Sequence, residues 1–197
     1  MASTSRSILK VAGICGLLAP IIAFGGIILA ILSYPQFSWS NNALSDLGVV
    51  PGFTAISFNI SLMASGILSL AFSAGLFLFT KESISGKIGA IIFVAVALSL
   101  FAIGLFPENM APMHFQASFA FFMLFPLSLF FTSAEFFKSA RARLAIFSFA
   151  MAIVGAAAWL LYFSTKFAPN VAIPETIAAL AVAAWTFVMG YKMVVEK

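Results

Sequence analysis

Charged residues are scarce in this sequence. Ten Lys and Arg and six Asp and Glu among 197 residues give a charged fraction of 8%, whereas a soluble domain carries about 25%. So few charges cannot cover a surface that faces water, which excludes a soluble globular enzyme. Intrinsic disorder is excluded as well, because disordered chains combine low hydrophobicity with a high net charge.

Cysteine and histidine are almost absent, with one residue of each. A single Cys excludes a disulfide framework, and one Cys with one His excludes a zinc site built from clusters of these ligands. The isoelectric point of ≈ 9.5 rests on only ten bases, whose positions follow membrane topology. We therefore expect no nucleic-acid partner and no bound cofactor.

Apolar residues dominate instead, at 63% of the chain with a mean hydropathy of +1.14. A helix needs about 20 mostly apolar residues to cross the hydrocarbon core, and six stretches have this length. A transmembrane β-barrel would show segments of about ten residues with alternating polarity, and that pattern is absent. We predict one all-α domain over residues 1–197, an integral membrane bundle of six transmembrane helices. The predicted spans are Val11–Tyr34, Thr54–Thr80, Ile88–Phe106, His114–Phe137, Ala145–Thr165 and Glu175–Tyr191.

Lys and Arg are distributed unequally over the loops between these spans. Lys166 stands alone on one side, and the other nine bases lie on the opposite side. Because short cytoplasmic loops carry the excess of Lys and Arg, both termini are predicted to be cytoplasmic. The first span is longer than the apolar part of a signal peptide, so we expect it to be retained. The nine bases are Arg6, Lys10, Lys81, Lys87, Lys138, Arg141, Arg143, Lys192 and Lys197, and the acids that accompany them, expected to be solvated, are Glu82, Glu135 and Glu196.

The remaining acids lie at the extracytoplasmic ends of the predicted spans. They are Asp46, Glu108 and Glu175, and the single histidine, His114, falls at the same level. Ionisable groups close to the hydrocarbon core are costly and point to a functional site. The sequence therefore predicts a polar site at this end of the bundle.

The first extracytoplasmic loop is long enough to hold a short helix. Ser40 can cap a helix over residues 41–47, and Gly48 suits the left-handed residue that ends such a helix. We expect this helix to lie in the membrane interface. Alternatively, the segment acts as a lid that brings Ser45 and Asp46 over the mouth of the bundle.

Serine recurs at every fourth position of the second predicted span. Small residues at this spacing let two helix backbones approach closely. A row with a period of four drifts slowly around a helix of 3.6 residues per turn, which favours a right-handed crossing over a straight polar channel. A hydrophilic path is the alternative, supported by Asn59 one turn inside the outer end. The row comprises Ser57, Ser61, Ser65, Ser69 and Ser73.

Several short motifs, taken in order and spacing, resemble the DUF998 family, a set of uncharacterised polytopic membrane proteins of archaea and bacteria. The resemblance covers nearly the whole chain. It implies a six-helix fold, a polar site built from the outer-end positions, and a place in a prokaryotic cell membrane. It implies no reaction. The motifs are Leu44-Ser45-Asp46-Leu47-Gly48, Phe58-Asn59, Gly104-Leu105-Phe106-Pro107-Glu108 followed by His114, and Pro174-Glu175.

One interpretation of the polar cluster is structural, with His114 tying the outer ends of the helices together. The protein is then an accessory or lipid-binding membrane protein. Its partners are membrane lipids, together with a larger membrane complex or a second copy of the chain. The candidate ligand-binding residues are Asn59, Glu175, Gln116 and Ser118, of which Ser118 lies one turn beyond His114 on the same helix face.

A second interpretation is a membrane-embedded hydrolase or transferase that acts on a lipid or another amphiphile. His114 would be the general base, since imidazole has a pKa near 6.5. Asp46 or Glu108 would orient its ring, and Ser45 or a water molecule would be the nucleophile.

Two further alternatives concern metal binding and transport. Met110, Met113 and His114 are closely spaced ligands of the kind that Cu(I) accepts. For transport, the sequence shows no pair of broken helices and no charged path through the midplane.

Overall fold

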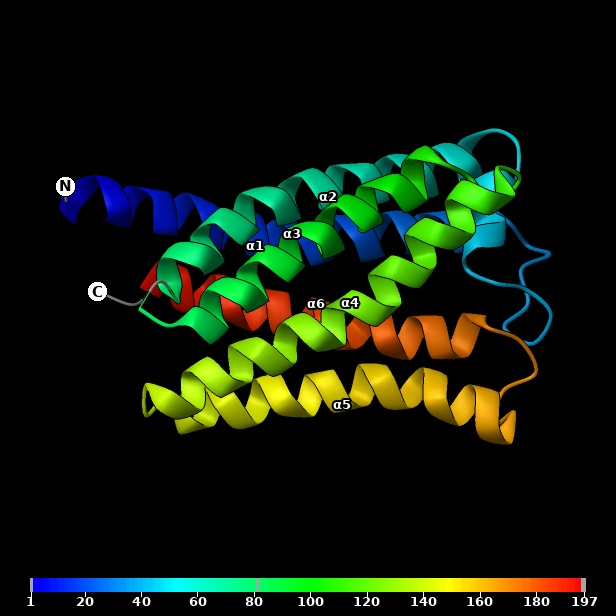
Figure 1. The fold of residues 1–197 in the computed structure, drawn as a ribbon. Coiled ribbons are helices and arrows are strands. Elements are labelled where there is room, and N and C mark those ends of the chain that lie inside the picture. The colour runs from blue at the N-terminus through cyan, green and yellow to red at the C-terminus, as the bar shows by residue number, and fades with distance from the viewer. Residues whose placement is uncertain (1, 81, 196–197) are drawn as a thin grey trace.

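The computed structural model describes residues 2–80 and 82–195, and within these residues the chain is helical with no strand. Six of the helices are long and apolar enough to cross a membrane, as predicted (Figure 1). Helices suit this role because every backbone N–H and C=O within lipid must find its partner in the same segment. The helices are α1 (Ala2–Leu32), α2 (Phe53–Phe79), α3 (Ile84–Leu105), α4 (Ala111–Lys138), α5 (Ala142–Thr165) and α6 (Ala172–Val195).

The six helices form a ring in which each one contacts the next and α6 returns to α1. Successive helices run in opposite directions, so that both termini lie at the same end of the bundle (Figure 1). We call this end the terminal end. The opposite end, where the loops after α1, α3 and α5 lie, is called the distal end.

Large aromatic side chains fill the middle of the ring. The Trp185 ring of α6 lies 6.0 Å from the Phe72 ring of α2 and 5.4 Å from the Phe93 ring of α3, measured between centroids. Its indole N–H donates a hydrogen bond of 2.8 Å to the Ser148 hydroxyl of α5. A buried Trp needs such a partner for its N–H. This arrangement links four helices through one side chain.

Helices α1 and α2 approach closely along the serine row. The Ser57 hydroxyl donates to the Gly26 carbonyl oxygen at 3.0 Å, and Ser65 donates to another carbonyl of α1 at 2.9 Å. A Cβ atom on Gly26 would lie 2.1 Å from the Ser61 side chain, so only glycine fits there. The packing interpretation is confirmed at these positions, whereas Ser69 lines a cavity.

The predicted helix in the first distal loop is wrong. The segment forms a short 3-10 helix, η1 (Ser45–Val49), with no side-chain cap, in place of an α-helix over residues 41–47 capped by Ser40. The reason is local competition: the Asn42 side chain accepts a backbone N–H and donates to Asp46 at 2.7 Å. Such side-chain hydrogen bonds offer the backbone an alternative to a regular helix.

Gly48 also has a different role from the one predicted. Among the described residues the glycine with positive φ is Gly52, at 89°. At Gly48 a Cβ atom would lie 2.7 Å from the Asn59 Oδ1 atom. The missing side chain lets η1 lie against the start of α2, where the Asn59 side-chain amide donates to the Gly48 carbonyl oxygen at 2.8 Å.

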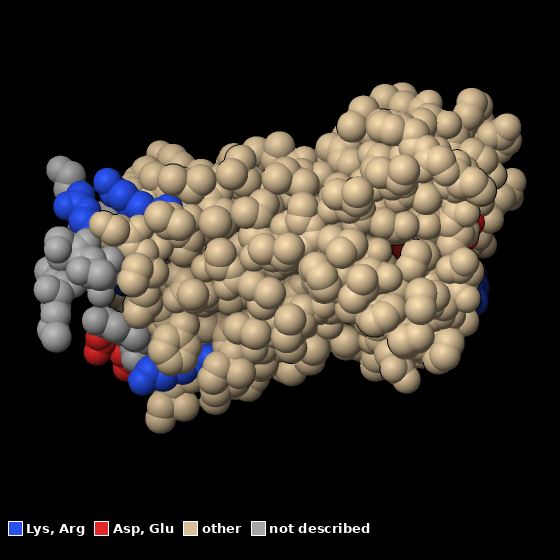
Figure 2. Space-filling model, turned by 90° about the horizontal axis from the view of Figure 1, so that it is seen from above, with Lys and Arg blue, Asp and Glu red and all other residues tan. Residues whose placement is uncertain are grey.

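Charges separate along the length of the bundle. Figure 2 shows Lys and Arg gathered at the terminal end, and Lys166, which ends α5, lies at the distal end. Which end is cytoplasmic stays a prediction.

Glu82 is exposed as expected, but Glu135 is only 6% exposed. That expectation was wrong because Glu135 lies on the buried face of α4, beside Phe136. Lys81, Glu196 and Lys197 lie outside the described residues.

The contact between α1 and α2 predicts a difference between two adjacent glycines. Gly26→Ala should lower the free energy of unfolding by about 1–3 kcal/mol, because the new methyl group overlaps Ser61 and the backbone of α2. Thermal unfolding in detergent measures this loss. Gly25→Ala is the matched control, since nothing lies within 4 Å of its Cβ position. Equal destabilisation by the two changes would contradict the proposed contact.

Candidate functional site

An apolar cavity of ≈ 100 Å³ lies inside the ring. Helices α1, α2, α3, α4 and α6 line it, together with the loop that contains η1. Along α6 it reaches from Glu175 to Thr186, a depth of about 16 Å at roughly 1.5 Å per residue. It is therefore long and narrow. Its polar lining residues are Ser45, Ser69, Ser118, Glu175 and Thr186, and its apolar ones include Phe24, Ile27, Phe93, Phe121 and Val182.

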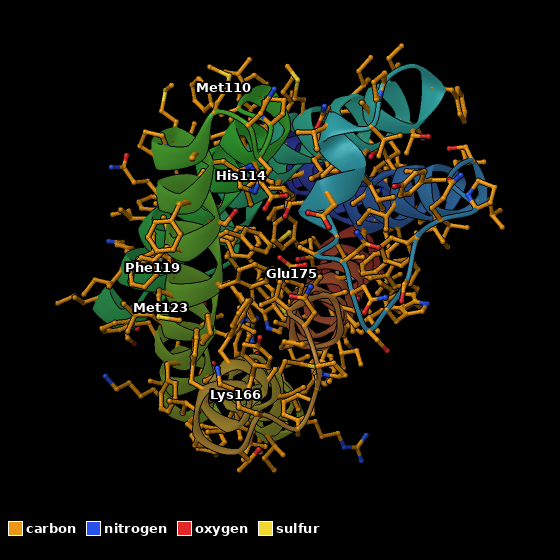
Figure 3. The ribbon with its side chains drawn as sticks, turned by 90° about the vertical axis from the view of Figure 1, so that its right-hand side faces the viewer. Met110, His114, Phe119, Met123, Lys166 and Glu175 are labelled. Atoms are coloured by element: carbon orange, nitrogen blue, oxygen red, sulfur yellow. The ribbon has the colours of Figure 1, made fainter. Side chains whose placement is uncertain are left out.

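Acidic side chains lie at the distal end of this cavity. Figure 2 shows Asp and Glu atoms inside a hollow in the side of the bundle, close to the distal end. Figure 3 looks onto that end: His114 and Glu175 lie toward the middle, whereas Phe119 and Met123 lie on the outer side of α4 and Lys166 lies apart. The predicted polar site is thus a mouth at the distal end, and its acids lie inside the ring.

Glu175 joins the last helix to the first loop. Its Oε2 atom accepts a hydrogen bond of 2.7 Å from the backbone N–H of Leu44. Glu175 also lies in the first turn of α6. A second bond runs beside it, because the Asn170 side-chain amide donates to the Asn41 carbonyl oxygen at 2.7 Å. The loop is therefore fixed over the mouth of the bundle.

Asp46 and Glu108 form a pair of neighbouring carboxyl groups. Asp46 is held as an acceptor by the Asn42 side-chain amide at 2.7 Å and by the Ala43 backbone N–H at 3.1 Å. Burial raises the pKa of Glu108 above its usual value, and the neighbouring Asp46 raises it further, while the Ser45 hydroxyl lowers it. A protonated Glu108 can donate to an ionised Asp46. Glu175 interacts electrostatically with both carboxyls, so the three acids do converge.

His114 is held by other groups than the carboxylates predicted to orient it. Its Nδ1 atom lies 2.7 Å from the Phe106 carbonyl oxygen, and its Nε2 atom lies 3.3 Å from the Ser118 hydroxyl. The side chain is buried, with 7% exposed. Ser118, predicted one turn beyond His114 on the same face, lines the cavity.

The other candidate residues fall into separate places. Ser45 is buried and lines the cavity. Asn59 holds η1 through Gly48, and its Oδ1 atom is buried without a hydrogen-bond partner. Gln116 is exposed and does not line the cavity.

The copper alternative gains no support from the geometry. Met110 and Met113 are 39% and 41% exposed, while His114 is buried. Within residues 2–80 and 82–195, no group of three or more His, Cys, Asp and Glu side chains is arranged to hold a metal ion.

Three parts of the site were missed by reasoning from the sequence. These are the Leu44 N–H, the Phe106 carbonyl oxygen and the deep lining residue Thr186. The first two are backbone groups, which carry no signal in residue type. Thr186 lies in a helix of ordinary apolar composition, and only the ring arrangement shows which face of that helix lines the cavity.

Comparison with known families identifies one match: the family described as "Protein of unknown function (DUF998)" matches residues 17–192. Comparisons with curated proteins and with solved structures give no match.

The Asp46–Glu108 pair predicts a dependence of stability on pH. Because the pKa of Glu108 is raised in the folded protein, its contribution to stability is complete below the unfolded value of about 4.5 and is lost as the pH rises through the folded value. Glu108→Gln mimics the protonated acid, so the variant should gain in melting temperature over the native protein as the pH is raised. Melting in detergent across this pH range measures the difference.

Glu82→Gln provides the control for that experiment, since it makes the same change on an exposed carboxyl remote from the site. If the melting temperatures of Glu108→Gln and the native protein differ by the same amount at every pH, a protonated Glu108 that donates to Asp46 is refuted.

Proposed function

The chain belongs to the DUF998 family, and since the function of that family is unknown, we propose one from the site: the protein binds an amphiphile, with an alkyl chain in the cavity and a polar head at the distal mouth. The observation that carries this proposal is the combination of a long apolar cavity with one acid in its lining, Glu175, which lies at the distal end beside Asp46 and Glu108.

The shape and lining of the cavity fit an alkyl chain. Aromatic and aliphatic side chains from five helices form its walls, and it is too narrow and too apolar for a polar metabolite. Genuinely apolar cavities stay dry and accept apolar ligands. The hollow in the side of the bundle gives an amphiphile access from the lipid phase rather than from water (Figure 2).

The mouth supports a head group that carries hydrogen-bond donors. Its polar groups are the carboxyl of Glu175, which accepts from the Leu44 N–H, and the hydroxyls of Ser45 and Ser118, which can accept or donate. The nearby Asp46–Glu108 pair adds negative charge. An amine or a polyhydroxy head group, which supplies hydrogen-bond donors to these oxygens, complements such a mouth better than an anionic head group without donors.

The structural role of the cluster is compatible with ligand binding. The hydrogen bonds from Leu44 to Glu175 and from Asn59 to Gly48 hold the first loop in place over the mouth. A fixed loop pre-organises the mouth, which lowers the entropic cost of binding a ligand there.

Quenching of Trp185 fluorescence by a brominated alkyl chain tests the proposal. Trp185 has 0% exposed surface, so bromine on lipids outside the bundle is shielded from it. Its ring lies 5.4 Å from that of Phe93, which lines the cavity. In a Trp39→Phe, Trp159→Phe background, brominated phosphatidylethanolamine in nanodiscs should therefore quench the remaining fluorescence.

Two adjacent alanines give a matched pair of variants. Ala183 lines the cavity, whereas Ala184 is exposed on the outer face of α6. Ala183→Phe should abolish most of the quenching by occupying the path of the chain, and Ala184→Phe should leave it unchanged. If the Trp185 fluorescence of the protein with an unchanged cavity is not quenched, or if it is quenched equally in both variants, the proposal is rejected.

A further inference from the structure

We infer that Ser118 and His114 form a nucleophile–base dyad that attacks an ester bond of the bound amphiphile. The inference rests on the proposed function, because the cavity has to bring the ester to Ser118. It differs from the assignment suggested by the sequence, in which Ser45 or water was the nucleophile and a carboxylate oriented the histidine.

The hydrogen bonds of His114 set its tautomer. A backbone carbonyl oxygen can only accept, so the Nδ1 atom of His114 carries the proton and donates to Phe106 at 2.7 Å. In the neutral ring the Nε2 atom then has a free lone pair. It faces the Ser118 hydroxyl at 3.3 Å, a separation within the looser range found before a substrate binds.

The Ser118 hydroxyl is directed differently from other hydroxyls within the helices. The ordinary pattern is donation to the carbonyl oxygen four residues earlier in the same helix, and some hydroxyls, such as those of Ser57 and Ser65, donate instead to a carbonyl of a neighbouring helix. The Ser118 hydroxyl instead meets the His114 ring, which leaves it available as a nucleophile. The residues that follow the ordinary pattern include Ser73, Thr132, Thr176 and Thr186.

The position of Ser118 suits an ester near the junction of head and chain. Ser118 lines the cavity, as do Glu175 and Ser45 at its mouth. If Glu175 holds the head group, the alkyl chain extends toward Thr186. The ester that joins head group and chain then lies beside the distal turns of α4, where Ser118 is. His114 is 7% exposed, so bulk water does not compete for its Nε2 atom.

The chemical step is acyl transfer. The Ser118 Oγ atom bonds to the ester carbonyl carbon while its proton moves to His114 Nε2. The ester C–O bond then breaks, and the departing alkoxide takes that proton to leave as an alcohol. Water, activated by the same Nε2 atom, hydrolyses the acyl-serine, which releases the fatty acid and restores the Ser118 hydroxyl.

A long-chain alkyl fluorophosphonate tests the dyad, because a serine activated in this way attacks phosphorus and displaces fluoride. The full-length protein in nanodiscs should gain one alkylphosphonyl group, located on Ser118 by peptide mass spectrometry. Ser118→Ala should abolish the labelling. His114→Gln can still donate to Phe106 but cannot take the proton, so its labelling rate should fall by about 10²-fold or more.

The control is Ser164→Ala, which removes an exposed distal hydroxyl remote from the cavity and should be labelled at the native rate. Trp185 quenching and the melting temperature, measured on the same samples, show whether each variant is folded and still binds the chain. Quenching without labelling, or labelling of Ser45 in place of Ser118, overturns the dyad and leaves amphiphile binding intact. Absence of quenching in the native protein overturns the binding proposal itself.

Discussion

Polar groups inside the bundle have no water to bind, and the arrangement of the protein follows from this constraint. Many hydroxyls on the helices donate to a carbonyl oxygen of their own helix or of a neighbour, as Ser57 and Ser65 do to α1. These bonds fix how closely the helices approach, since leaving a donor unpaired in an apolar medium costs several kcal/mol, about 2–7. A few buried polar atoms lack such a partner, among them Asn59 Oδ1 and Glu108 Oε2 at the distal end and Glu135 Oε2 near the terminal end of α4.

The distal end combines two roles in one set of side chains. The Glu175 carboxylate accepts from Leu44 and thereby closes the ring between the first loop and the last helix, while the same residue lines the cavity. Asp46 is fixed within its own loop, and Glu108 meets it from the loop between α3 and α4. The structural interpretation and the ligand-binding interpretation of the cluster therefore describe the same geometry, because a rigid mouth is what a selective site requires.

The helices could be predicted from the sequence because span length and hydropathy are local properties of the chain. The end of the bundle at which the acids and His114 gather could also be predicted, because ionisable groups are few and therefore conspicuous in an apolar sequence. The loop helix could not, because Asn42 and Asp46 compete for the backbone in a way that cap preferences do not describe. The partners of His114 could not either: Phe106 contributes a backbone carbonyl, and the fold decides which of several polar groups the ring meets. Burial of Glu135 likewise depends on which face of α4 turns inward.

Selectivity in such a site cannot come from the alkyl chain alone. Lipid tails are as apolar as the cavity walls, so a chain that moves from the bilayer into the ring gains little from the hydrophobic effect. The difference between one amphiphile and the surrounding excess of lipid must then arise from cavity shape and from the few polar atoms at the mouth. These polar atoms belong to Glu175, Ser45 and Ser118. In a chain with 8% charged residues, placing three acids at one end of the bundle is costly, and under the proposed function head-group discrimination at that end offsets the cost.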